Sequence, residues 1–140
     1  MDLSVPLIQP GDTYEQPVTF TQEQVAAFAD VSGDRNPLHL DAEYTARTAF
    51  RRPIVHGFLA GSVFSRILGM EFPGEGSIYL EQSMQFLRPV YPGTACRVLL
   101  TVLEADPATH RARIRTQLFQ TGPDKLLIDG EALVLHKKRI

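Results

Sequence analysis

The chain has 140 residues, of which 44% are hydrophobic and 21% are charged, a balance typical of a single globular domain. Its formal net charge of −2 provides no electrostatic basis for binding nucleic acid or an anionic membrane surface. The only cysteine, Cys96, excludes an internal disulfide and a metal cage of several thiolates. We therefore expect one domain over residues 1–140, in a reducing compartment such as the cytoplasm.

The beginning of the chain gives no sign of export or membrane insertion. Residues 1–10 lack the basic segment and apolar run of a secretory signal peptide, so we expect none. No apolar stretch approaches the roughly 18 residues needed to cross a bilayer, so we also expect no membrane span.

A strand followed by a helix is expected next. Residues 14–20 have strand-like content, and Pro17 indicates an edge strand because proline cannot donate to a sheet ladder. Thr21 followed by Gln24 is typical of a capping box, and apolar residues at helical spacing follow it. This pattern predicts a helix that ends at Gly33, in the manner of a C-terminal cap.

Residues 34–40 place a carboxylate and an imidazole five positions apart. A glycine before this stretch and a proline within it disfavour a continuous helix, in which side chains at i and i+5 would diverge. Asp34 and His39 can converge in a kinked loop, and we interpret them as a candidate acid/base pair. An isolated Asp-x-Asn-Pro sequence is more often an Asx-type turn, and this turn role of Asn36 can coexist with catalysis.

The most buried helix is expected over residues 56–69, after a short helix over residues 41–46 that an aspartate caps. Gly57, Gly61 and Ser65 recur at every fourth position, so one stripe of the long helix is nearly bare backbone. A bare stripe lets a sheet or a ligand approach closely. Each interior glycine costs about 1 kcal/mol relative to alanine, so a compensating contact is expected.

The remainder of the chain is dominated by strands. Apolar and β-branched residues bounded by proline and glycine turns predict strands over residues 77–87, 95–103, 112–119 and 126–136. Helices followed by a run of strands indicate an α+β domain with an antiparallel sheet. The simplest packing wraps this sheet around the long helix, which is the only element hydrophobic enough to cover one of its faces.

The four histidines show no spacing typical of metal ligands, so we expect no metal site. His110 and His136 stand beside charged or polar residues and are expected to be exposed. His56 precedes the long helix, where it serves either a structural purpose or the orientation of the loop.

Residues 32–41, SGDRNPLHLD, resemble the signature of the MaoC-like hydratases. Residues 53–57 (PIVHG), 76–80 (GSIYL) and 86–93 (FLRPVYPG) are similar to further segments of those proteins. The likeness covers nearly the whole chain and is strongest to the short (R)-specific enoyl-CoA hydratases of bacterial polyhydroxyalkanoate and fatty-acid metabolism. One departure is Gly33, where close relatives can have a bulkier residue, and we expect no effect on the chemistry.

The resemblance implies a single hot-dog domain, an antiparallel sheet wrapped around a long central helix, and a homodimer. It also implies reversible syn addition of water to a trans-2-enoyl-CoA, giving an (R)-3-hydroxyacyl-CoA, without a cofactor because coenzyme A is part of the substrate. The catalytic aspartate and histidine of the family match Asp34 and His39. Three substrate-binding positions match Asn36, Gly57, whose N–H would bind the thioester oxygen, and Ser65, which is similar to a serine that supports the catalytic aspartate.

Two other functions remain open. A hot-dog thioesterase would use an acidic residue to activate water against the carbonyl, although the complete Asn-Pro-Leu-His context disfavours it. A non-catalytic acyl-CoA-binding domain is disfavoured by the two ionisable groups in the turn. The acyl pocket is expected along the glycine stripe, with Phe58, Met84 and Leu133 as candidates for its end wall, and Arg88 is a candidate contact for the phosphates of coenzyme A.

Overall fold

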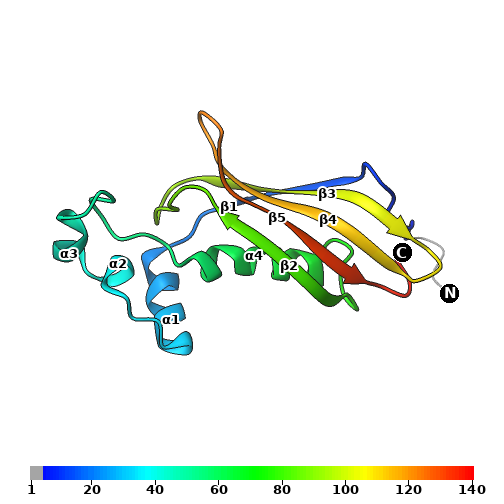
Figure 1. Cartoon of the computed structure of the whole chain (residues 1–140), viewed down its shortest axis with the longest axis horizontal. Helices are drawn as coiled ribbons and strands as arrows, with labels where there is room; N and C mark the ends of the chain where they lie inside the picture. Colours follow the sequence, from blue (N-terminus) through cyan, green and yellow to red (C-terminus); the bar gives the residue numbers. More distant parts are fainter. Residues whose placement is uncertain (1–4) are drawn as a thin grey trace.

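A five-stranded antiparallel sheet and one long helix make up most of the fold (Figure 1). The computed structural model describes residues 5–140, so the part of the signal-peptide expectation that concerns residues 1–4 lies outside the described residues. The elements in chain order are β1 (Thr13–Val18), α1 (Gln22–Ser32), α2 (Pro37–Leu40), α3 (Ala42–Ala46), α4 (Gly57–Met70), β2 (Ile78–Phe86), β3 (Cys96–Asp106), β4 (Arg111–Gln120) and β5 (Lys125–Leu135).

The strands are ordered β1-β3-β4-β5-β2, and each neighbouring pair is antiparallel. Strands β3, β4 and β5 follow one another directly, whereas β1 and β2 form the two edges. Pro17 lies in β1, opposite Arg97 of β3, which confirms the edge strand that its missing N–H predicts.

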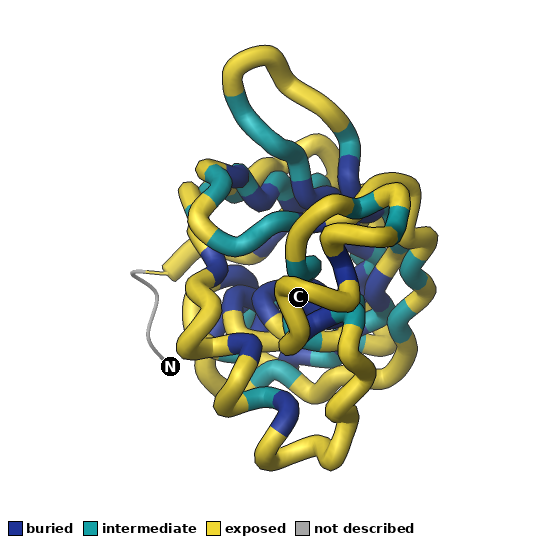
Figure 2. Tube along the Cα trace, turned by 90° about the vertical axis from the view of Figure 1, so that its left-hand side faces the viewer, coloured by how far each residue is buried: buried dark blue, intermediate teal, exposed yellow. Residues whose placement is uncertain are grey.

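Helix α4 lies against one face of this sheet and supplies the centre of the hydrophobic core (Figure 1). Alternate residues of β3 and β4 point toward it, because successive side chains of a strand face opposite sides of the sheet. The buried positions gather inside the trace, and exposed positions surround them (Figure 2). The largest buried side chains of this core include Phe64, Ile67, Leu100, Ile114 and Leu118. The expected α+β architecture, a sheet around a central helix, is confirmed.

The glycine stripe of α4 is a contact with β2. A Cβ atom built on Gly57 would lie 2.8 Å from a ring carbon of Phe86, and one built on Gly61 would lie 2.5 Å from the sulfur of Met84. The missing side chains therefore let β2 approach the helix. The acyl pocket expected along this stripe has no open space at these two glycines, because side chains of the same chain fill it.

Two histidines are less exposed than their polar neighbours in the sequence indicate. His136 is 5% exposed; its Nε2–H donates to the Glu75 carbonyl (2.9 Å), and its Nδ1 accepts the N–H groups of Lys138 and Arg139. His110 is half-buried, with Nδ1 2.7 Å from the Ile140 carbonyl oxygen. The expected exposure of both was wrong, since the folded chain covers them.

Within residues 5–140, no helix combines the length and apolar character that crossing a membrane requires.

Candidate active site

The turn that holds Asp34 begins where α1 ends. The Thr21 hydroxyl accepts the Gln24 N–H, and the Gln24 side chain accepts the Thr21 N–H, so the predicted capping box is present. At the other end Gly33 has φ 79°, a left-handed conformation that suits glycine, and its N–H donates to the Ala29 carbonyl. The helix therefore stops at Gly33 and releases the chain into the turn.

One hydrogen bond within the turn holds the Asp34 carboxylate. The Asn36 N–H donates to Oδ1 of Asp34 (3.3 Å), while the Asn36 side chain caps α2 by accepting the Leu38 N–H (3.1 Å). Pro37 occupies the first turn of α2, where its missing N–H costs nothing. The Asx-type turn expected for Asn36 is thus present, and Asp34 remains exposed.

His39 lies on α2 and is 9% exposed. Its Nδ1 is 2.8 Å from the Ile54 carbonyl oxygen, which can only accept a hydrogen bond, so Nδ1 bears the proton and Nε2 of the neutral ring is an acceptor. The Gln22 side chain donates to the His39 carbonyl (3.0 Å) and ties α2 to α1. These contacts fix both the tautomer and the direction of the ring.

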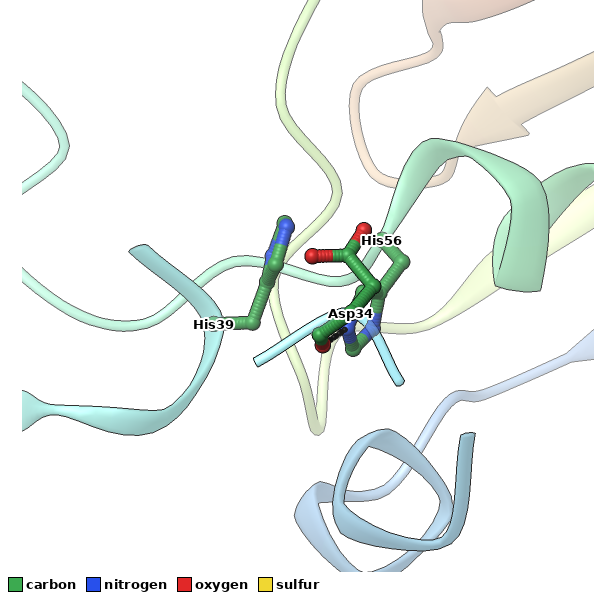
Figure 3. A group of neighbouring side chains, drawn as sticks. All are labelled: Asp34, His39 and His56. Atoms are coloured by element: carbon green, nitrogen blue, oxygen red, sulfur yellow. Dashed lines mark hydrogen bonds between the residues drawn. The ribbon is translucent and has the colours of Figure 1, made fainter. Parts of the chain in front are cut away.

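His56 is the third member of the site. It is 1% exposed, and its ring stacks on the ring of His39 with centroids 3.9 Å apart and planes inclined by 28°. Its Nε2–H donates to the backbone carbonyl of Asp34 (3.0 Å), as Figure 3 shows. The sequence left two interpretations of His56 open, a structural purpose or the orientation of the loop. The available signal was a histidine that follows the apolar residues 53–55 and directly precedes the glycine of a long helix.

Asp34, His39 and His56 converge. One oxygen or ring nitrogen from each lies within 4.8 Å of the others, and the carboxylate of Asp34 lies beside the ring of His39 (Figure 3). Three such groups could in principle hold a metal ion. However, the nitrogen lone pairs lie in the planes of the two stacked rings, so they do not converge readily on one ion. A carboxylate and an imidazole are groups that can take up and release protons.

The other expected site residues lie on α4. Gly57 is its first residue, and among the described residues no hydrogen bond satisfies its N–H. Ser65 lies two turns further along, is exposed, and makes no hydrogen bond to Asp34 in the described part of the chain. The structure thus brings Asp34, Asn36 and His39 together, places Gly57 directly after His56, and leaves Ser65 apart from them.

An antiparallel sheet around one long helix is the architecture of a hot-dog domain, and here a carboxylate and two imidazoles converge on the segments beside it. The family model of the MaoC like domain matches residues 7–119, most of the chain, and the chain belongs to that family.

Two curated relatives and one solved structure extend this result. The chain is 48% identical to the (R)-specific enoyl-CoA hydratase of Aeromonas caviae over 117 residues, 82% of this chain and 85% of the relative. It is 37% identical to the 3-hydroxybutyryl-CoA dehydratase of Methylorubrum extorquens over 119 residues, 85% of this chain and 74% of the relative. The structure of the A. caviae (R)-hydratase involved in PHA biosynthesis superposes with a TM-score of 0.88 at 42% identity, covering 92% of this chain and 97% of that one.

Proposed function

We propose that this protein is an (R)-specific enoyl-CoA hydratase, which reversibly adds water to a trans-2-enoyl-CoA to give an (R)-3-hydroxyacyl-CoA. The observation that supports this best is the pairing of Asp34 with His39: a carboxylate oxygen and a ring nitrogen lie within 4.8 Å of each other, without a direct hydrogen bond between the two side chains in the described residues. The names of the relatives agree, one as a hydratase and one as a dehydratase, which describe the two directions of one equilibrium.

The gap between Asp34 and His39 suits one water molecule. Hydrogen bonds between oxygen and nitrogen or oxygen are about 2.7–3.2 Å long, so a water can donate one hydrogen to the carboxylate and the other to Nε2. Both groups are acceptors when Asp34 is ionised and His39 is neutral. A water held in this way directs its lone pairs away from the pair, toward the substrate.

Asp34 then acts as the general base. It takes a proton as the water oxygen forms its bond to Cβ, and the resulting carboxylic acid can return a proton to Cα. One carboxyl group that serves both steps delivers hydrogen and hydroxyl to the same face, which is syn addition. His39 accepts a hydrogen bond from the second hydrogen of the water; this bond orients the water, and the hydrogen remains on the hydroxyl group of the product.

Negative charge develops on the thioester oxygen during this step. The first N–H groups of a helix are unpaired, and the helix dipole favours a negative charge near them, so the Gly57 N–H is the proposed donor to that oxygen. Losing one such donor typically costs about 3 kcal/mol of transition-state stabilisation. We also assign Asn36 and Ser65 to substrate binding, Asn36 because it lies beside Asp34 and Ser65 because its side chain is exposed on α4.

No cofactor is required in this proposal, because an acid/base pair and an oxyanion donor supply the chemistry and coenzyme A belongs to the substrate. We also propose a cytoplasmic location, because a chain with a single cysteine forms no internal disulfide and suits a reducing compartment.

The partner is proposed to be a second copy of this chain, paired along β2. Within residues 5–140 this edge strand has no neighbour on its outer side, and apolar side chains lie exposed on it and near it, including Phe58 (72%), Ile78 (52%) and Phe86 (52%). A long apolar edge invites pairing with another strand. The opposite edge is less suitable because Pro17 lacks an N–H.

Sedimentation at equilibrium should give twice the mass of one chain, and a monomeric mass would refute the pairing.

The activity is tested with purified protein and crotonyl-CoA, by loss of absorbance at the enoyl-thioester band. Asp34→Asn and His39→Gln should each lower kcat by roughly 10²–10⁴-fold, the usual contribution of a positioned acid or base. Asp41→Asn is the matched control: Asp41 caps α3 through Tyr44 N–H (3.0 Å), asparagine caps equally well, and activity should persist. Wild-type activity in either site variant would refute the assigned role.

The same reaction separates the alternatives. A thioesterase would release a free thiol, which a thiol dye detects, and a binding domain would retain acyl-CoA without turnover. No absorbance loss with enoyl-CoAs of four to twelve carbons would overturn the hydratase assignment. With turnover established, the same panel defines the preferred chain length.

A further inference from the structure

His56 connects the two halves of the candidate site, and we propose that it is a positioning residue that fixes Asp34 and His39 for the hydration step. The inference rests on the proposed function, since the step it serves is that reaction. His56 is the N-cap residue of α4, directly before Gly57, yet its ring lies against the turn that holds the acid/base pair (Figure 3).

The hydrogen bond from His56 acts on the backbone of Asp34. Its Nε2–H donates to the Asp34 carbonyl oxygen at 3.0 Å, while the Asn36 N–H donates to the carboxylate at 3.3 Å. One contact fixes the backbone of Asp34 and the other fixes its side chain. Together they set the direction in which the carboxylate projects.

The ring of His56 also positions His39. The two rings stack with centroids 3.9 Å apart, and Phe28 contacts the His56 ring at 4.8 Å with planes inclined by 57°. His39 is thus restrained by this stack and by the bond from its Nδ1 to the Ile54 carbonyl. With its rotation restricted in this way, the His39 ring stays beside the carboxylate of Asp34.

The polar character of His56 shows which contact matters. Its Nδ1 is buried and has no hydrogen-bond partner among the described residues. Buried polar atoms in native proteins almost always have partners, and leaving one without a partner is destabilising. A phenylalanine would fill the same space between Phe28 and His39 without this penalty. Compared with phenylalanine, histidine adds the Nε2–H, which donates to the backbone carbonyl oxygen of Asp34.

Two substitutions separate the hydrogen bond from the ring. His56→Phe keeps a ring to stack on His39 but removes the donor, whereas the side-chain amide of His56→Gln can reach the Asp34 carbonyl without a ring. With crotonyl-CoA, His56→Phe should lower kcat by roughly 10–100-fold, as expected when a supporting contact is lost, and should leave KM within about twofold. His56→Gln should recover part of that loss, because it restores the donor to the Asp34 carbonyl but not the stack on His39.

The chain offers a matched control in His136. This histidine is also buried, and its Nε2–H also donates to a backbone carbonyl, that of Glu75, outside the acid/base turn. His136→Gln should therefore keep the wild-type kcat, whatever it does to stability. Circular dichroism and thermal unfolding establish that each variant is folded. If His56→Phe does not fold, His56→Asn replaces it, because its shorter amide cannot reach the Asp34 carbonyl.

The outcomes separate this inference from the proposed function. A wild-type protein without hydratase activity refutes the function. An active wild type with a His56→Phe variant of unchanged kcat, a His56→Gln variant no better than His56→Phe, or an equal loss in His136→Gln overturns the role of His56 alone.

Discussion

Replacing Gly61 by alanine tests whether Met84 occupies the glycine stripe of α4. The new Cβ would lie 2.5 Å from Sδ and 2.9 Å from Cε of Met84 in their present positions. Non-bonded carbon atoms in good contact are about 3.5–4.0 Å apart, so the end of the methionine must move by about 1 Å or more. Its contact with the helix would be lost or rearranged.

The magnitude follows from two opposing effects. Alanine is favoured over glycine in a helix interior by about 1 kcal/mol. Overpacking a core typically costs about 1–3 kcal/mol, and the flexibility of methionine favours the lower part of this range. Gly61→Ala alone should therefore lower the free energy of unfolding by about 0–2 kcal/mol. In a Met84→Ala background the obstacle is gone, and the same change should raise it by about 1 kcal/mol.

Urea unfolding of the four proteins of this cycle measures the effect, at one fixed protein concentration because association shifts apparent stability. The expected result is a change of sign between the two backgrounds. Equal stabilisation by Gly61→Ala in both would refute the contact between Met84 and the stripe.

Two further predictions follow from the structure. Gly130→Ala should lower the free energy of unfolding in urea by more than about 3 kcal/mol, a larger loss than for Gly61→Ala. The new Cβ would collide with the backbone carbonyl of Ser83, which cannot move as a side chain can. A smaller loss than for Gly61→Ala would contradict this. Cys96 is 3% exposed, and burial raises the pKa of its thiol. A thiol dye at pH 8 should therefore label the folded protein far more slowly than the urea-unfolded chain. Equal labelling rates would show that the thiolate is accessible in the folded protein.

Local sequence signals predicted most of the fold because each acts over a few residues. The capping box at Thr21, the left-handed Gly33 and the N-cap Asp41 are all present, since each depends on hydrogen bonds or dihedral angles within one turn. The strands were predicted from their alternation, with ends that differ by one to three residues from those observed. Pro17 indicated its edge position through a missing donor.

The candidate site could be predicted only in part. Asp34 and His39 are five residues apart in a kinked turn, so their convergence follows from local geometry. The contact of His56 with Asp34 joins residues 22 positions apart and depends on how α4 packs against the turn. The burial of His136 has the same origin, since its neighbours in the sequence are polar and the loop at Glu75 covers it.

The segment from residue 33 to residue 56 projects beyond the sheet, with α2 and α3 at one end of the molecule (Figure 1). Val55 is the residue of this segment that joins the hydrophobic core, and backbone bonds such as Val55 N–H to the Val90 carbonyl (2.7 Å) attach it to the rest. Regions with few core contacts open at lower free energy than the core itself. Heating should therefore inactivate the enzyme before the sheet unfolds, and cooling from that point should restore activity without refolding of the strands.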